Sequence, residues 1–134
     1  MLYGKEHVQR YRDTDGAEGH DWNDTTVLLL THRGRNSGRE YTTPLIDQKH
    51  GDDYVIVASK GGDPSHPEWY LNLLADPEAG VQVKGDVFKA RARTATAEEK
   101  PELWSLMTAT WPSYDDYQRK TDREIPVVVL EPAR

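Results

Sequence analysis

The chain has 134 residues, which fits one domain spanning residues 1–134 and leaves little room for a second. Its net charge of −6 argues against nucleic-acid binding, because an acidic chain gains nothing from counterion release on a polyanion. The absence of cysteine excludes disulfides, thiolate metal sites and cysteine nucleophiles. No run approaches about 20 apolar residues, so no integral membrane segment is predicted. The expected location is the cytoplasm.

In chain order, the residues predict a short helix, three strands, a helix, a two-stranded hairpin, a helix and a last strand. These elements cover residues 4–12, 27–33, 39–47, 54–59, 67–76, 81–95, 97–110 and 126–132. Residues 13–25 are expected to be a loop, and residues 112–124 a loop with a short helix. Tight turns join most neighbouring strands, so the sheet should be largely antiparallel, and a six-stranded sheet of this size tends to close. The predicted fold class is mainly β with helices (α+β), as a six-stranded antiparallel β-barrel.

Three local features make sharper predictions. Proline cannot donate to a strand ladder, so Pro44 must lie at an edge or a bulge. The apolar stripe of the helix at 67–76 should consist of Tyr70, Leu73 and Leu74. For the second long helix, a capping box at Thr96–Glu99 favours an early start, whereas Pro101 favours one nearer Lys100.

A basic turn at residues 34–38 is the first candidate for chemistry. Three arginines between residues 33 and 39 have no acid among them, and guanidinium groups bind phosphate oxygens in pairs. The candidate phosphate ligands are Arg35, Asn36, Ser37 and Gly38. The alternative is an ordinary solvent-exposed hairpin turn.

A glycine-rich loop at residues 60–66 is the second candidate. It connects a strand to the start of a helix, where free N–H groups and the helix dipole favour an anion, and Lys60 adds a full charge. The loop matches neither the Walker nor the dinucleotide-binding motif, and an ordinary strand-to-helix connection is the alternative. If the sheet closes, the two loops are expected to lie together.

Aromatic residues supply the third candidate. Trp69 and Asn72 share one side of a helix and could border a flat heterocycle, or simply pack at the rim of the core. Trp111, Tyr114 and Tyr117 are spaced by three, so a helix would place them on one face, where the tyrosines could donate protons or only pack. The five histidines show no metal-ligand spacing, and no nucleophile elbow is present, so neither a metal nor a hydrolase nucleophile is predicted.

Three segments together resemble the deazaflavin-dependent nitroreductases of actinobacteria, which use coenzyme F-420. They are VLLLTHRGRNSGREYTTPL, YVIVASKGGDPSHPEWYLNLLADP and YQRKTDREIPVVVLEP, and the resemblance runs from about Trp22 to Pro132. It implies a split β-barrel close to FMN-binding, pyridoxamine oxidase-like proteins. Asn36, Tyr41 and Trp111 depart from residues that are common in the family. Some relatives associate with membranes through the amino-terminal segment, which leaves peripheral membrane contact open here.

The resemblance also implies the roles of individual residues. The deazaflavin ring would lie against Thr43, Pro44 and Leu45, and against the strand end at Val57, Ala58, Ser59, Lys60 and Gly61. The basic turn, helped by Lys60, would hold the tail phosphate, and Trp69 and Asn72 would border the ring. Tyr114 and Tyr117 would line the substrate side with Trp111, where either could orient the substrate and supply a proton, with solvent as the alternative proton source. Lys60 and the strand-end amides could stabilise negative charge on the oxidised ring.

The implied activity is hydride transfer from reduced F-420 to a flat, electron-poor substrate: a quinone, a nitroaromatic compound, or an unsaturated lactone or enone. One alternative is an FMN-dependent reductase of the same fold. Another is a deazaflavin-binding protein without turnover. The chain could act as a monomer or as a homodimer.

Overall fold

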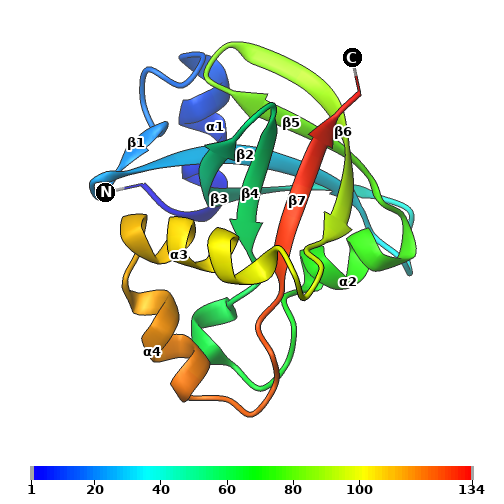
Figure 1. Cartoon of the computed structure of the whole chain (residues 1–134). Helices are drawn as coiled ribbons and strands as arrows, with labels where there is room; N and C mark the ends of the chain where they lie inside the picture. The colour runs from blue at the N-terminus through cyan, green and yellow to red at the C-terminus, as the bar shows by residue number, and fades with distance from the viewer. Residues whose placement is uncertain (1, 134) are drawn as a thin grey trace.

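The structure, a computed structural model, describes residues 2–133. Its elements follow one another along the chain as labelled in Figure 1. The helices are α1 (Gly4–Asp13), the 3-10 helix η1 (Lys60–Gly62), α2 (Glu68–Ala75), α3 (Lys100–Thr110) and α4 (Ser113–Arg119). The strands are β1 (Asp21–Trp22), β2 (Thr25–Arg33), β3 (Glu40–His50), β4 (Asp53–Val57), β5 (Glu78–Val83), β6 (Asp86–Thr94) and β7 (Val127–Pro132).

Six strands close into an antiparallel barrel, as predicted from the tight turns between them. The hydrogen-bonded order is β1-β2-β3-β4-β7-β6-β5, and a pairing of β2 with β5 closes the ring. At this closure Leu30 lies opposite Val81. Closure leaves the six strands without a free edge along most of the ring, which removes a template for aggregation.

The predicted loop at 13–25 is wrong in one respect, because it contains β1. Asp21 and Trp22 pair with the start of β2. Asn23 and Asp24 connect the two strands with φ values of 48° and 64°. Left-handed backbone at both central positions is the type I′ hairpin turn, which Asn and Asp tolerate better than other side chains. A two-residue strand is too short to show the alternation of apolar and polar residues that predicts a strand. The turn dipeptide Asn23-Asp24 is therefore its only signal in the sequence.

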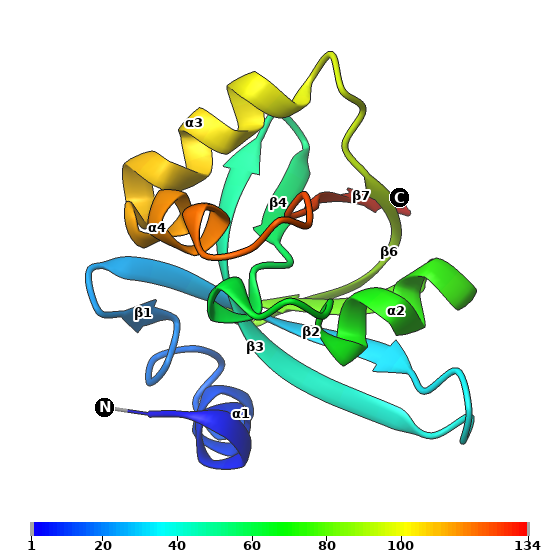
Figure 2. The same ribbon diagram turned by 90° about the horizontal axis from the view of Figure 1, so that it is seen from below.

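Strand β3 is long and only partly covered by neighbours. It pairs with β2 over eight residues, but with β4 only from Gln48 to His50. Pro44 lies opposite Leu29 in the ladder with β2, and its other side faces no strand. The predicted edge position of this proline is therefore confirmed. Helix α1 packs against β3 (Figure 2), so the uncovered part of the strand lies within reach of the amino-terminal segment.

Two apolar clusters form the core. Alternate residues of β4 and β7 point to opposite sides, so that Ile56 and Val128 fill the barrel while Val55 and Val129 pack outward against α3 and α4. The predicted stripe of α2 is partly wrong, because Leu74 is 60% exposed. The buried face of α2 consists instead of Trp69, Tyr70, Asn72 and Leu73. Successive residues of a helix are rotated by about 100° around its axis. Leu74 therefore points to solvent while its neighbour Leu73 points to the core.

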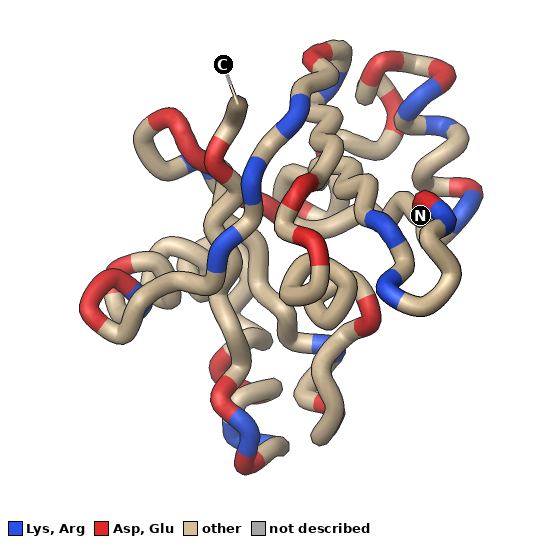
Figure 3. The backbone as a smooth tube through the Cα atoms, turned by 90° about the vertical axis from the view of Figure 1, so that its right-hand side faces the viewer, with Lys and Arg blue, Asp and Glu red and all other residues tan. Residues whose placement is uncertain are grey.

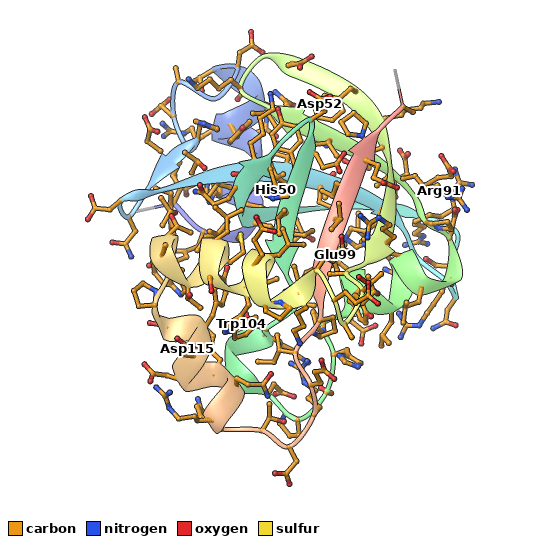
Figure 4. The ribbon with its side chains drawn as sticks, viewed as in Figure 1. His50, Asp52, Arg91, Glu99, Trp104 and Asp115 are labelled. Carbon is orange, nitrogen blue, oxygen red and sulfur yellow. The ribbon has the colours of Figure 1, made fainter. Side chains whose placement is uncertain are left out.

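Helix α3 begins at Lys100, and both predicted start signals are present. The backbone N–H of Thr96 donates to Glu99 Oε1 at 2.8 Å, and that of Glu99 donates to Thr96 Oγ1 at 3.3 Å. This capping box closes the turn that precedes the helix. Trp104 of α3 donates its indole N–H to Asp115 of α4 at 2.8 Å, and this hydrogen bond joins the two helices. Both side chains are labelled in Figure 4.

Acidic and basic residues are interleaved along most of the backbone (Figure 3), so the charge of −6 does not come from one acidic end of the chain. Within residues 2–133, none of the helices is long and apolar enough to span a bilayer.

Candidate active site

Two joined cavities open beside β3 and α2. The first, of about 510 Å³, is called the apolar cavity and the second, of about 870 Å³, the polar cavity. The apolar cavity is lined by Tyr3, Gly4, His7, Trp22, Val27, Thr43, Pro44, Leu45, Ile46, Val57, Ser59, Lys60, Gly61, Pro67, Trp69, Trp111, Tyr114 and Tyr117. The polar cavity is lined by Lys5, Val8, Gln9, Arg12, His32, Gly34, Arg35, Asn36, Ser37, Glu40, Tyr41, Thr42, Thr43, Glu68, Trp69 and Asn72. Thr43 and Trp69 line both, so one elongated molecule can occupy the two together.

The floor of the apolar cavity is the uncovered part of β3 and the end of β4. Pro44 and Leu45 line it on β3, and Val57 lines it at the end of β4. A cavity with mostly apolar walls and a few polar groups suits a planar heterocycle.

The loop after β4 carries Lys60 into this cavity on strained backbone. Lys60 has a φ of 46°, and Gly61 and Gly62 follow at 63° and 84°. Left-handed backbone costs a residue with a side chain about 1–2 kcal/mol, and such strain is often concentrated at ligand sites. A Cβ on Gly62 would lie 2.7 Å from the backbone oxygen of Tyr117, so glycine is needed for α4 to approach the loop.

Arg123 fixes that loop from the opposite direction. Its guanidinium donates to the backbone oxygens of Asp63 at 2.8 Å, Ala58 at 3.2 Å and Ser59 at 2.8 Å. It also lies 3.1 Å from His66 Nδ1. One planar donor therefore holds both the end of β4 and the following loop, which sets the position of Lys60 in the cavity.

The aromatic wall comes from the junction of α3 and α4. Trp111 ends α3 rather than belonging to α4, so the three aromatic residues do not form one helical face, but all three line the cavity. The Trp111 indole donates to the Tyr117 hydroxyl at 3.4 Å. Tyr114 is 4% exposed, and burial raises the pKa of its hydroxyl, which stays protonated at neutral pH. Among residues 2–133 that hydroxyl has no hydrogen-bond partner, so it is available to a ligand.

A second aromatic wall comes from the amino-terminal segment, which the sequence did not point to. The ring of Trp22 lies 5.9 Å from that of Trp111 and 6.3 Å from that of His7. The indole of Trp22 donates to the backbone of Leu2 at 2.8 Å, and His7 Nε2 lies 2.8 Å from the Gly19 oxygen. These contacts close the cavity on the side away from α2.

The polar cavity is organised by Asn72, which is 4% exposed. Its Oδ1 accepts from the Arg35 backbone N–H at 3.1 Å and from the Arg35 guanidinium at 2.8 Å. Since Arg35 can only donate, the amide nitrogen must face His32 Nδ1, at 3.0 Å. His32 Nε2 then carries the proton and donates to Thr43 Oγ1 at 3.2 Å. A continuous chain of hydrogen bonds thus links the basic turn to a residue that lines both cavities.

Burial also changes the pKa of a histidine in this hydrogen-bond network. It lowers the pKa of His32, which keeps the imidazole neutral and able to accept from Asn72. The ring of Tyr41 stacks over it at 6.0 Å, and Tyr41 shares a 3.2 Å hydrogen bond with Ser37. Tyr41, one of the departures from common family residues, therefore covers the buried imidazole.

The structure brings most of the predicted site residues to the two cavities. Lys60 lines the apolar cavity and Arg35 the polar one, so the two cations lie in adjoining spaces rather than in one. Two predicted residues line neither cavity. Ala58 is fully buried, with its N–H bonded to the Pro126 oxygen, and the Gly38 N–H is used by the Gly34 oxygen.

Several residues of the site escaped the sequence analysis because they meet only in the folded chain. His32, Arg123, His7 and Trp22 belong to four different segments. His32 and Arg123 lie in segments that the resemblance singled out. Nothing in their spacing indicates the buried amide beside His32 or the three backbone acceptors of Arg123.

Comparison with known proteins identifies the family of the chain. A sequence profile of the F420H(2)-dependent quinone reductase family matches residues 3–132. The chain belongs to this family. The predicted resemblance to deazaflavin-dependent reductases is thereby confirmed.

Similar proteins align with most of the chain. An F420H(2)-dependent quinone reductase of Mycobacterium tuberculosis (strain ATCC 25618 / H37Rv) is 38% identical over 128 residues, or 92% of this chain and 86% of that protein. A solved F420-H2 dependent reductase (FDR-A) is 42% identical with a TM-score of 0.73, covering 78% of this chain and 93% of that chain. A solved domain-swapped dimer is 38% identical with a TM-score of 0.76, covering 95% and 96%.

A more distant neighbour bears on the fold alone. A structure from Listeria innocua named for pyridoxamine 5′-phosphate oxidase is 13% identical, with a TM-score of 0.57 over 81% of this chain and 84% of that chain. The predicted pyridoxamine oxidase-like barrel is confirmed by this match.

Proposed function

We propose that the chain transfers a hydride from reduced coenzyme F-420 to a quinone. The observation that carries this proposal is the pair of neighbouring cavities, which share Thr43 and Trp69: one is mostly apolar and the other is lined by the basic turn. They fit a cofactor with a planar ring and an anionic tail. The family name identifies quinones among the three acceptor classes predicted, while nitroaromatic compounds and enones are further candidates.

The ring fits the apolar cavity, against Pro44, Leu45 and Val57, with Trp69 at its border. The tail phosphate fits beside Arg35, Asn36 and Ser37 in the polar cavity. When bound, reduced F-420 supplies the hydride, and the protein supplies placement and electrostatics. Lys60, whose charge has no acidic partner within 4 Å among residues 2–133, would stabilise negative charge on a ring bound in this cavity.

The acceptor fits between the ring and the aromatic wall. Tyr114 keeps its proton at neutral pH and donates a hydrogen bond to an acceptor oxygen. Tyr117 accepts the Trp111 indole N–H, which leaves its own O–H proton available to donate to a ligand in the cavity. Holding the acceptor in this orientation can lower the barrier by as much as about 7–11 kcal/mol in the best cases.

The test is the oxidation of reduced F-420 by the purified protein, followed by absorbance with a panel of quinones, nitroaromatic compounds and enones. Turnover with quinones is expected. Tyr114→Phe should lower kcat while leaving the Kd of the cofactor within about twofold, because only the acceptor contacts that hydroxyl. Saturable binding without turnover of any acceptor would favour a carrier, and a yellow purified protein with an FMN spectrum would favour the FMN alternative.

The phosphate position has a separate test. Arg35→Ala should weaken binding of oxidised F-420 by about 1.5–3 kcal/mol, the value of a charged hydrogen bond. Arg39→Ala is the matched control, because Arg39 follows the same turn but lines neither cavity. Equal affinities for the two variants would place the phosphate elsewhere. Whether the enzyme acts as a monomer or a homodimer stays a prediction.

A further inference from the structure

One face of α1 forms a wall of the polar cavity. Lys5, Val8, Gln9 and Arg12 line it, at helix positions i, i+3, i+4 and i+7. This spacing places the four side chains on one face of the helix. Residues of the basic turn, Gly34, Arg35, Asn36 and Ser37, line the same cavity, so two segments far apart in the sequence contribute to it.

The two segments differ in how their cations are used. Arg35 is already committed: it donates to Asn72 and forms an ion pair with Glu68 at 2.8 Å. Among residues 2–133, Lys5 and Arg12 have no acidic partner within 4 Å. Glu40 also lines the cavity, yet it pairs with neither of them. Lys5 and Arg12 of α1 are therefore cations of this cavity whose charge no acidic side chain offsets among the described residues.

Arg12 is nevertheless held in place. Its guanidinium donates to Thr42 Oγ1 at 2.8 Å, and Thr42 shares a 2.9 Å hydrogen bond with Thr31 on β2. A neutral hydroxyl fixes the guanidinium without neutralising it. The remaining N–H groups stay available for an anionic ligand.

We propose that Lys5 and Arg12 bind the glutamate carboxylates of the F-420 tail, beyond the phosphate that the basic turn binds. This inference rests on the proposed function. The tail of F-420 continues from its phosphate through lactate into a chain of glutamates, which carries one or more carboxylates. Because α1 and the basic turn line the same cavity, the helix adds a second set of cations that selects cofactors with such a tail.

The experiment measures the Kd of oxidised F-420 carrying several glutamates, and of the bare deazaflavin riboside that lacks phosphate and glutamates. Wild type is compared with the double variant Lys5→Gln/Arg12→Gln. Arg10→Gln is the matched control on the same helix, because Arg10 pairs with Glu18 and lines neither cavity. Circular dichroism checks that α1 stays folded.

The double variant should bind the tailed cofactor roughly tenfold more weakly, with a shallower dependence on salt, and bind the bare riboside as wild type does. Restoring Lys5 alone should recover part of the loss. Unchanged affinity for the tailed cofactor, or an equal loss for both ligands, would overturn the inference and leave the proposed function standing. If wild type bound neither ligand, the proposed function would fail as well.

Discussion

The two cavities are built on different principles. In the polar cavity, side chains are already bonded to one another: Asn72 joins Arg35 to His32, and His32 joins Thr43. In the apolar cavity, the Tyr114 hydroxyl has no hydrogen-bond partner among residues 2–133, and aromatic rings supply much of the lining. The comparison indicates that the proposed tail site is preorganised by hydrogen bonds, whereas the proposed acceptor site would select by shape. Mutations should therefore act on affinity in one cavity and on turnover in the other.

Asn72→Ala should have the largest effect. It leaves the Arg35 N–H and the His32 imidazole without partners in a buried site, which costs about 2–4 kcal/mol of unfolding free energy when two such losses combine. Cofactor affinity should fall with it. Urea unfolding and a cofactor titration measure both, and Asn72→Asp, which keeps the acceptor for Arg35, should recover part of the stability. An unchanged unfolding midpoint would show that the polar cavity is not held by this network.

Trp22→Leu should separate the two cavities. It removes the ring contacts with Trp111 and His7, each worth about 0.5–1.5 kcal/mol. The KM for a quinone should rise roughly fivefold, the equivalent of about 1 kcal/mol, with the cofactor Kd within about twofold. Steady-state kinetics and binding give the two numbers. A loss confined to cofactor affinity would mean that Trp22 faces the ring instead of the acceptor.

Acidification should weaken the polar cavity first. Burial lowers the pKa of His32 below its usual 6.5 in the folded chain, so the unfolded chain takes up the proton first. The stability linked to this group is thus present above about pH 6.5 and is lost as the pH falls through the folded pKa. The pKa of His66 is also lowered, chiefly by burial. The pH dependence of the melting temperature should therefore be flatter in His32→Gln, but not flat, and identical slopes in both proteins would exclude a role for His32.

Glu68→Gln should have the smallest effect, and in the opposite direction. The Glu68 side chain, which pairs with Arg35, is 73% exposed. Breaking this ion pair therefore costs little unfolding free energy, on the order of 0–1 kcal/mol. The freed guanidinium should bind the cofactor a few-fold more tightly. Weaker binding would mean that Glu68 orients Arg35 rather than competing with the phosphate.

Sequence reasoning found the features that are local in the chain. The basic turn, the glycine loop and the edge position of Pro44 each follow from neighbouring residues, and tight turns between strands predict the closed barrel. Leu74 was misplaced, because an eight-residue helix has too few turns to define its buried face. Arg123 and Trp22 were missed, since their partners lie far along the chain and are backbone oxygens or other rings. Such contacts leave no periodic pattern in a sequence.

The most direct test is a crystal structure of the protein with oxidised F-420. The account predicts that the ring lies over Pro44 in the apolar cavity, with the phosphate oxygens within hydrogen-bonding distance of Arg35 and Ser37. Density for the phosphate beside Lys60 instead, or for a ring outside the space between Trp69 and Tyr114, would contradict it.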